Sequence, residues 1–421
     1  MGKTDGETIK YFCIVNEAGD GNILSVRIFS RYYLWLAGNI YDICLMWIKR
    51  YLRKSISDEL IKGQKLVVLY GARQTGKTSL LTSITDELPY KTVRVNADQA
   101  RYQEVFSGQD LKKMRDLVEG YELLFIDEGQ KIPDLGIHLK ILHDELPSLR
   151  VVVTGSSSFD LATKIGEPMT GRKRVFTLFP LSQEEMGSMH NSFELKQLLD
   201  DFLVFGSYPE VLTQSNRNDR FEVLREIGES YLMKDIIEIG QIRHIQKAYQ
   251  LLKLLAFQVG SEVSIHELSQ SLKLNHETVE SYIGLFEKAF VLFRLGGFSR
   301  NLRNEIKKSS KIYFWDTGIR NYLIGNVNRL DQRNDSGALF ENFLIAERQK
   351  WLNNHRFLAN SYFWRLYTGA EIDYVEENQG VLTGYEIKWG KGSIRIPKSW
   401  TETYKADVLL LNRENYLDFI K

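Results

Sequence analysis

One eight-residue stretch constrains the fold of this chain more than any other feature. Gly71-Ala-Arg-Gln-Thr-Gly76-Lys77-Thr78 fits the pattern G-x-x-x-x-G-K-[ST], follows the apolar run Lys65–Tyr70 and opens a helical stretch. In that setting the glycines let the backbone curl so that successive amides face phosphate oxygens, and the start of the helix adds its positive end. Lys77 is then expected to reach the β- and γ-phosphates, and the Thr78 hydroxyl to coordinate Mg²⁺.

The expected ligand is therefore a nucleoside triphosphate, with ATP and Mg²⁺ as the expected cofactors. No base-reading motif is visible, so the motif alone does not separate ATP from GTP. The residues expected to cradle the phosphates are Gly71, Ala72, Arg73, Gln74, Thr75, Gly76, Lys77, Thr78 and Ser79.

A second apolar run, Leu123–Ile126, ends in Asp127 and Glu128. A buried strand that delivers carboxylates at its carboxyl end would place Asp127 where it supports Mg²⁺ and Glu128 where it polarises the attacking water. Apolar runs that end in two acids are common, and it is the position of this one after the phosphate-binding motif that gives it meaning.

A third apolar run ends in Thr154-Gly155-Ser156-Ser157-Ser158. Ser156 is predicted to contact the γ-phosphate or the water between the other two strand ends, and a serine-rich turn is the alternative. Arg172 is predicted to act as an arginine finger toward a neighbouring active site, which would require a homo-oligomer. A solvated basic loop explains Arg172 equally well.

Short runs rich in Val, Ile and Leu alternate with helical stretches up to residue 182, which predicts a parallel sheet covered on both faces. The predicted strands are Lys65–Tyr70, Thr92–Asn96, Glu122–Ile126, Arg150–Thr154 and Arg174–Leu178. Helices are predicted after Pro180. From Leu251 to Ile324, helices beginning at Ser264 and Asn275 precede two strands, and this order suggests a winged helix-turn-helix.

Carboxylates gather again near the end of the chain, where Glu371–Val375 and Tyr385–Lys388 are predicted to be neighbouring strands. Residues two apart on a strand share a face, so Asp373 and Glu386 can meet with Lys388 beside them, while Glu341 approaches from the preceding helix. Carboxylate oxygens suit Mg²⁺, which could activate a water against a phosphodiester, with Lys388 orienting that water. A cross-strand ion pair explains Glu386 and Lys388 without a metal.

The order of these motifs resembles that of prokaryotic AAA-type ATPases with a C-terminal domain of unknown function, over about residues 48–400. Further motifs that carry the resemblance are Ile48-Lys-Arg-Tyr-Leu, Gly206-Ser-Tyr-Pro-Glu210, Lys234-Asp235, Phe314-Trp-Asp-Thr-Gly318 and Trp364-Arg365. The resemblance implies an ATP-binding AAA-type core, a winged-helix segment and a C-terminal domain with a restriction-endonuclease-like fold. The D…E-x-K set of that fold, Asp373, Glu386 and Lys388, is complete here.

The expected fold class is therefore α/β: a P-loop NTPase core with a parallel sheet, a helical lid, a winged helix-turn-helix segment and a restriction-endonuclease-like α/β domain. The expected boundaries are 1–47 for an N-terminal extension, 48–190 for the core, 191–250 for the lid, 251–335 for the winged-helix segment and 336–421 for the last domain. The resemblance begins just after Met46, so we expect that methionine to be the native start.

Composition limits the partners. With 55 basic and 54 acidic side chains, binding to DNA or to an anionic membrane has to come from local patches. Two cysteines and a polar amino end fit a cytoplasmic protein, and no membrane association is expected. Basic residues of the expected wing could contact phosphates, namely Arg300, Arg303, Lys307, Lys308 and Lys311, and so could Lys391, Arg395 and Lys398. The expected recognition helix carries Glu277, Glu280 and Glu287, which favours a protein partner there over base reading.

The leading functional hypothesis is an ATPase whose nucleotide state moves the winged-helix and nuclease-like domains, acting on or near DNA. One alternative is a slow nucleotide-gated protein-interaction switch with a catalytically silent C-terminal domain. The other is a metal-dependent nuclease licensed by ATP.

Overall fold

The computed structural model describes residues 48–420 except 107, 109, 157–168, 233–235, 237–241, 243, 300–309, 367, 391 and 395, and only the backbone of 230–232. The N-terminal extension and the proposed start at Met46 lie outside this range. All elements below belong to the unit Lys49–Lys421. No helix among the described residues is long and apolar enough to cross a membrane.

Five parallel strands form the sheet of the amino-terminal core, in the order β2-β3-β4-β1-β5. The strands are β1 (Leu66–Tyr70), β2 (Thr92–Asn96), β3 (Leu123–Asp127), β4 (Arg150–Gly155) and β5 (Lys173–Thr177). Each predicted strand is confirmed to within one residue at either end. The order brings the carboxyl ends of β1, β3 and β4 together at the middle of one sheet edge, which is where crossover topology creates a binding crevice.

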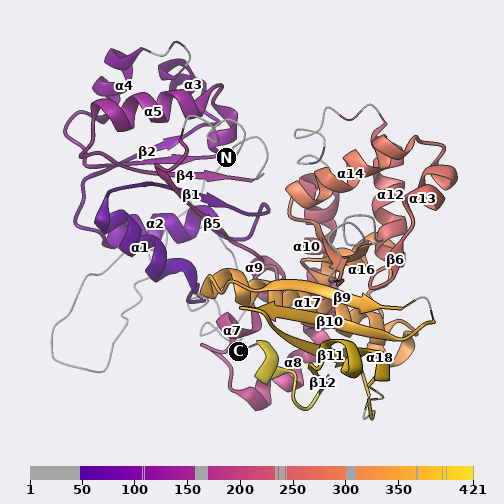
Figure 1. Ribbon diagram of the computed structural model, residues 1–421. Coiled ribbons are helices and arrows are strands. Elements are labelled where there is room, and N and C mark those ends of the chain that lie inside the picture. Colours follow the sequence, from indigo (N-terminus) through magenta and orange to yellow (C-terminus); the bar gives the residue numbers. More distant parts are fainter. Residues whose placement is uncertain are drawn as a thin grey trace, which may run out of the picture. The chain divides into compact units, whose positions relative to one another are not determined.

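Alternating side chains of this sheet enter two separate cores. On β1, Leu66, Val68 and Tyr70 pack with helices α4 (Leu111–Val118) and α5 (Leu135–Glu145), whereas Val67 and Leu69 pack with α1 (Leu52–Lys62) and α2 (Lys77–Glu87). Figure 1 shows these helices on opposite faces of the sheet. Burial on both faces explains why the strands are continuously apolar in sequence. The remaining short elements of the core are α3 (Ala100–Val105) and the 3₁₀ turn η1 (Gly129–Lys131).

Helices follow the sheet, as the sequence predicts. They are α7 (Gln183–Met186), α8 (Ser192–Phe205), α9 (Pro209–Leu212), α10 (Arg217–Glu226), the π-helical η2 (Ile227–Leu232) and α12 (Ile245–Phe257). The side chains of Ser182 and Asn191 each accept a backbone N–H at the start of α7 and α8 and complete capping boxes there. These caps satisfy amides that a helix start otherwise leaves unpaired.

The next segment has the order helix, strand, helix, helix, strand, strand. After α12 come β6 (Glu262–Val263), α13 (Ile265–Leu272), α14 (His276–Lys288), β7 (Leu292–Gly297) and β8 (Ser310–Phe314). Ser264 and Asn275 cap α13 and α14 through their side chains, at the two predicted helix starts. The predicted order of helices and strands is present, and the winged-helix fold itself stays a prediction.

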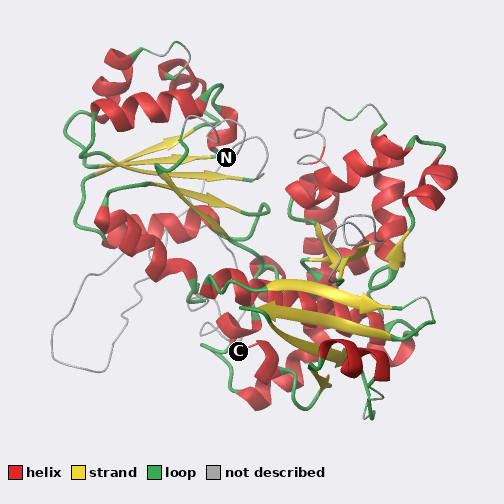
Figure 2. Cartoon of the chain, viewed as in Figure 1, coloured by secondary structure: helices red, strands yellow, loops and turns green. Residues whose placement is uncertain are grey.

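A seven-stranded sheet runs from this segment into the C-terminal part, in the order β12-β11-β10-β9-β7-β8-β6 (Figure 2). Its further strands are β9 (Asn360–Arg365), β10 (Glu371–Asn378), β11 (Val381–Ile387) and β12 (Asp407–Leu411). Gly296 and Gly297 of β7 pair in parallel with Tyr362 and Phe363 of β9. The two segments that the sequence analysis treats as separate domains therefore share one sheet.

Four helices and one 3₁₀ turn complete this part: α16 (Thr317–Ile324), η3 (Leu330–Gln332), α17 (Ser336–His355), α18 (Lys398–Tyr404) and α19 (Leu417–Ile420). Aromatic and branched side chains fill a core on this sheet, with Phe298, Trp364, Ile372, Val375, Trp400 and Val408 at its centre.

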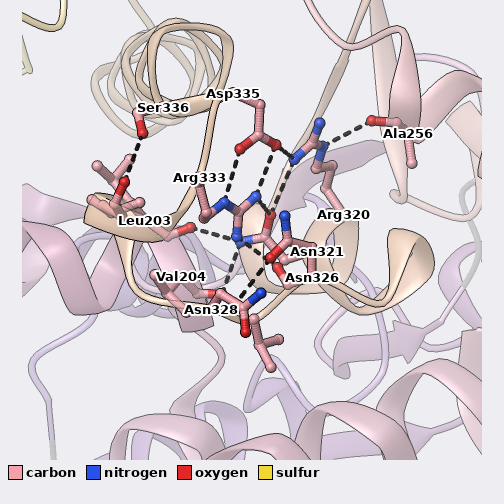
Figure 3. A network of polar contacts seen from close by, with 12 residues as sticks. Leu203, Val204, Ala256, Arg320, Asn321, Asn326, Asn328, Arg333, Asp335 and Ser336 are labelled. Carbon is pink, nitrogen blue, oxygen red and sulfur yellow. Dashed lines mark hydrogen bonds and ion pairs between the residues drawn. The ribbon is translucent and has the colours of Figure 1, made fainter.

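A network of buried polar groups joins α16 to its neighbours (Figure 3). Asp335, just before α17, accepts hydrogen bonds from Arg333 at 2.8 and 2.9 Å and from Arg320 at 2.5 Å. Arg320 also donates to the carbonyl of Ala256 at the end of α12, and Asn321 donates to the carbonyl of Leu203 in α8. Because buried charges are stable only when paired, this network fixes where these helices meet.

Candidate active site

The phosphate-binding loop occupies the predicted position between β1 and α2. Gly71 has φ 151°, and a Cβ there would lie 2.1 Å from the carbonyl oxygen of Leu178, so no larger residue fits. Gly76 has φ 93° and forms the N-cap of α2, a conformation that side-chain-bearing residues rarely adopt. The sequence requirement for glycine at both positions thus has a direct geometric cause.

Lys77 is buried inside the curl of this loop. Its Nζ donates to the carbonyl oxygens of Gly71 at 2.8 Å and Ala72 at 2.9 Å. The Thr75 hydroxyl donates to Ala72 O at 2.9 Å and closes the loop on itself. The ammonium group is thereby held at the start of α2, where the amides and the helix end already favour an anion.

Thr78 and Asp127, which the sequence places on separate elements, lie in direct contact. The Thr78 hydroxyl is 3.0 Å from each carboxylate oxygen of Asp127, and the Thr154 hydroxyl donates to Asp127 Oδ1 at 2.5 Å. A hydroxyl beside a carboxylate fits Mg²⁺, which prefers oxygen ligands and usually combines one or two carboxylates with substrate phosphates. These two residues would hold the ion that the motif implies.

Glu128 follows Asp127 in an unusual backbone conformation. Its φ of 55° and ψ of 41° are left-handed, and its N–H donates to the Thr154 hydroxyl at 2.9 Å. Its carboxylate oxygen Oε2 accepts a hydrogen bond from Gln130 Nε2 at 2.6 Å. Strained residues of this kind persist where the surroundings enforce them, and they are frequent at active sites.

A cavity of about 380 Å³ lies beside the phosphate-binding loop, and its volume is within the range of small-molecule sites. Lys77, Thr78 and Glu128 line it together with Asp98 and Lys131, which the sequence analysis did not select. Asp98 follows the end of β2 and Lys131 follows the end of β3. Both residues follow the carboxyl ends of strands that the sequence predicts, and this position could have identified Asp98 and Lys131 as candidates. The other lining residues are Arg73, Gln74, Gly76 and Ser79.

Ser156 is close to this cavity without being among its lining residues. Only 2% of the residue is exposed, and its hydroxyl accepts a hydrogen bond from Gln130 Nε2 at 3.1 Å. The residue of this turn that contacts both acids is Thr154. The contact of Ser156 with the γ-phosphate or with the attacking water therefore stays a prediction, and the side-chain partner that the structure gives this hydroxyl is Gln130.

Arg172 lies at the opposite end of the sheet. Its carbonyl accepts the N–H of Leu66 at the beginning of β1, whereas the phosphate-binding loop follows the end of that strand, about 16 Å away at 3.3 Å per residue. Its guanidinium pairs with Asp144 at 2.9 Å on the surface. Arg172 therefore does not serve the pocket of its own chain, and a role toward a neighbouring chain stays a prediction.

The C-terminal carboxylates lie near one another, each with a protein partner. Asp373 accepts the N–H of Ile387 at 2.8 Å, and Glu386 pairs with Lys388 at 2.6 Å. Tyr313 donates to Glu341 at 2.6 Å. Among the described residues no group of three or more His, Cys, Asp or Glu side chains is arranged to hold a metal ion. The metal site at Glu341, Asp373, Glu386 and Lys388 stays a prediction that this geometry does not favour.

Lys311 explains much of that arrangement. It belongs to β8, is 2% exposed, and pairs with Glu371 and, at 3.5 Å, with Glu341. Burial raises the pKa of Glu341, and the nearby Lys311 ammonium opposes that rise. The expectation that Lys311 contacts phosphates is wrong, because its charge is buried against carboxylates. Of the other expected basic contacts, Lys398 is exposed, and Arg300, Arg303, Lys307, Lys308, Lys391 and Arg395 lie outside the described residues.

Comparison with known proteins agrees with this site. Residues 63–187 match a family described as "AAA domain", so this part of the chain is an AAA-type P-loop ATPase domain. Residues 196–330 and 336–416 match two domains of unknown function, DUF8612 and DUF4143.

Two of the similar proteins are described as uncharacterized. An uncharacterized protein of Methanocaldococcus jannaschii is 25% identical over 77% of this chain and 75% of its own length. One of Mycobacterium tuberculosis is 28% identical over 77% of this chain and 70% of its own length. Among solved structures, the Walker-type ATPase of Pyrococcus abyssi covers 66% of this chain and 95% of its own, at 14% identity and a TM-score of 0.46.

Proposed function

We propose that this chain binds ATP with Mg²⁺ in the cavity beside α2 and hydrolyses it to ADP and phosphate. The observation that carries the proposal is that Lys77, Thr78 and Glu128 line one cavity, with Asp127 hydrogen-bonded to Thr78. An ammonium group, an oxygen-ligand pair for the metal ion and a carboxylate that can orient water are three parts that phosphoryl transfer to water uses.

Each residue has a separate task in this reaction. Lys77 and the amides at the start of α2 bind the β- and γ-phosphates, and Thr78 and Asp127 would hold Mg²⁺. The ion, when bound, neutralises charge that develops on the phosphate oxygens. Glu128 orients a water and accepts its proton as the water oxygen bonds to the γ-phosphorus and the bond to the β–γ bridging oxygen breaks.

Replacement of Glu128 by Gln tests this assignment. The variant keeps the shape of the side chain and removes the basic carboxylate, so we expect ATP affinity to stay near that of the wild type while turnover falls roughly 100-fold or more. Binding is measured by calorimetry and turnover by phosphate release. Unchanged turnover would remove Glu128 from the role of base.

We further propose that the nucleotide state is transmitted to the C-terminal helices. A series of hydrogen bonds that leads from the loop through Arg50 and α7 to α17 supports this: Arg50 donates to Thr75 O at 2.8 Å and to Glu185 of α7 at 3.0 Å. The N–H of Gln183 then donates to Glu347 of α17 at 2.6 Å, and Glu347 pairs with Lys350 at 2.7 Å. A nucleotide can shift the balance between two arrangements of these helices only if it binds one arrangement more tightly than the other. The loop that would bind the phosphates takes part in these contacts, so binding there can favour one arrangement.

Action on or near DNA is the third part of the proposal, and a slow nucleotide-gated protein-interaction switch is its alternative. Turnover measured with and without duplex DNA distinguishes them, since stimulation supports the first and indifference favours the second. Nuclease action by Asp373 and Glu386 is tested by incubating plasmid with Mg²⁺ or Mn²⁺, with Asp373→Ala as the control.

A further inference from the structure

We propose that Gln130 is the positioning residue for hydrolysis, because its side-chain amide holds the Glu128 carboxylate in line with the attacking water. The inference rests on the proposed ATPase function and deepens it. It gives a role to a residue that neither the motifs nor the similar proteins assign.

The Gln130 amide bridges two strand ends. Gln130 lies in η1, directly after β3, and its Nε2 donates to Glu128 Oε2 at 2.6 Å and to the Ser156 hydroxyl, after β4, at 3.1 Å. A primary amide carries two N–H donors, so both bonds can form together. Gln130 is 9% exposed and Ser156 2%, so water competes little for either bond.

The backbone around Glu128 is fixed independently of this amide. Thr154 accepts the Glu128 N–H, and Gly129 is packed so tightly that a Cβ there would lie 2.5 Å from Val153 Cγ1. These contacts fix the backbone of Glu128, but they do not fix the position of its carboxylate. Among the contacts described above, the Gln130 bond alone reaches that carboxylate.

The bond also orients the carboxylate of Glu128. Oε2 accepts the amide N–H, which leaves Oε1 as the oxygen with both acceptor sites open to a water in the cavity. Misplacement of a reacting group by about 1 Å can cost on the order of 100-fold in rate. Loss of the amide should therefore lower the rate of hydrolysis while leaving the phosphate-binding loop intact.

Four variants of the full chain test the inference: Gln130→Ala, Gln130→Glu, Gln130→Ala combined with Glu128→Gln, and Gln103→Ala as the matched control. Gln103 also donates its side-chain amide to a buried partner in the core, the carbonyl of Ala97 at 2.7 Å, and it is not among the cavity residues. Each variant is measured for thermal midpoint, for ATP affinity and for turnover under saturating ATP.

We expect Gln130→Ala to lower kcat on the order of 10- to 100-fold, with ATP affinity and thermal midpoint close to those of Gln103→Ala. In the Glu128→Gln background the same change should have little further effect, since two residues that act through one step are not additive. A full additional loss in that background would overturn the inference, because Gln130 would then act independently of Glu128.

Gln130→Glu keeps the length of the side chain but replaces the N–H donor that faces Glu128 by a carboxylate oxygen. The Glu128 carboxylate then loses this donor, so we expect kcat to fall at least as far as in Gln130→Ala. Wild-type kcat in Gln130→Glu would contradict the inference, because the size of the side chain alone would then explain the role of Gln130.

Turnover equal to wild type in Gln130→Ala means that the amide only packs, and faster turnover means that it restrains Glu128; both results overturn the inference. Failure of the proposed function looks different. In that case the wild type itself releases no phosphate, and Glu128→Gln has nothing to slow.

Discussion

Thr154 shows how single residues organise this site. Its hydroxyl donates to Asp127 and accepts the N–H of Glu128, so one side chain orients both acids. Ser156, two residues further along, is the residue that the sequence predicts at this strand end. The two positions differ by two residues on one strand end, and the choice between them depends on how β4 lies against β3, which a single sequence does not contain. Lys77 could be predicted because the loop motif contains it, and Asp127 and Glu128 because they end an apolar strand that follows this motif.

At this scale, Asp127→Asn should weaken ATP binding only when Mg²⁺ is present. The substitution removes the charge of one ligand, worth about 1.5–3 kcal/mol, and hence roughly 10- to 100-fold in affinity. Titrations of ATP with Mg²⁺ and with chelator measure the difference. Asp144→Asn, at the far end of the sheet beside Arg172, is the control, and a Mg²⁺-dependent gain that survives in Asp127→Asn would contradict the assignment.

Among the elements, the five strands of the core could be predicted and the seven-stranded sheet could not. Strands covered on both faces give continuous apolar runs that are readable locally. The second sheet depends on the parallel pairing of β7 with β9, which joins segments far apart in the chain, and on Lys311 turning inward to carboxylates. In the sequence the same lysine lies in a basic segment. Nothing in the local sequence distinguishes a lysine in a buried ion pair from a lysine in solvent, so its burial could not be predicted.

At the scale of elements, the prediction concerns the glycine that begins the loop between β1 and α2. Gly71→Ala should abolish ATP binding and destabilise the core by several kcal/mol, because its Cβ would overlap the carbonyl oxygen of Leu178. Gly120→Ala is the matched control, since Gly120 has φ 74° with its nearest neighbour at 3.9 Å. It carries only the cost of a left-handed conformation, about 1–2 kcal/mol. Equal effects of the two changes in urea denaturation and in ATP titration would contradict this account.

For the whole molecule, the network around Asp335 ties α16 to α8, α12 and the start of α17 (Figure 3). Burial alone would raise the pKa of Asp335, but hydrogen bonds from Arg333 and Arg320 outweigh it and hold the pKa well below its usual range. A carboxyl group with a lowered folded-state pKa stabilises the fold above its unfolded value, about 3.9, and this contribution is lost as pH falls below it.

Asp335→Asn should therefore lower the free energy of unfolding by about 3 kcal/mol at pH 7, because two buried guanidinium groups lose their partner. The difference from wild type should begin to shrink as pH falls below about 4, because the carboxyl group of the unfolded chain then takes up a proton while that of the folded chain stays ionised. Urea denaturation at a series of pH values measures it, with the exposed Asp418→Asn as the control. A difference that is constant from pH 7 to pH 3 would show that charge is not its cause.

The central claim is that the loop after β1 holds a triphosphate and its magnesium against the acidic end of β3. Calorimetric titration of nucleotide-free protein with ATP and Mg²⁺ tests it most directly, with Lys77→Ala as the paired variant. We predict saturable heat with one site per chain for the wild type and none for the variant, whose thermal midpoint should stay near that of the wild type. Absence of heat from well-folded wild-type protein, or undiminished binding by Lys77→Ala, would contradict the account.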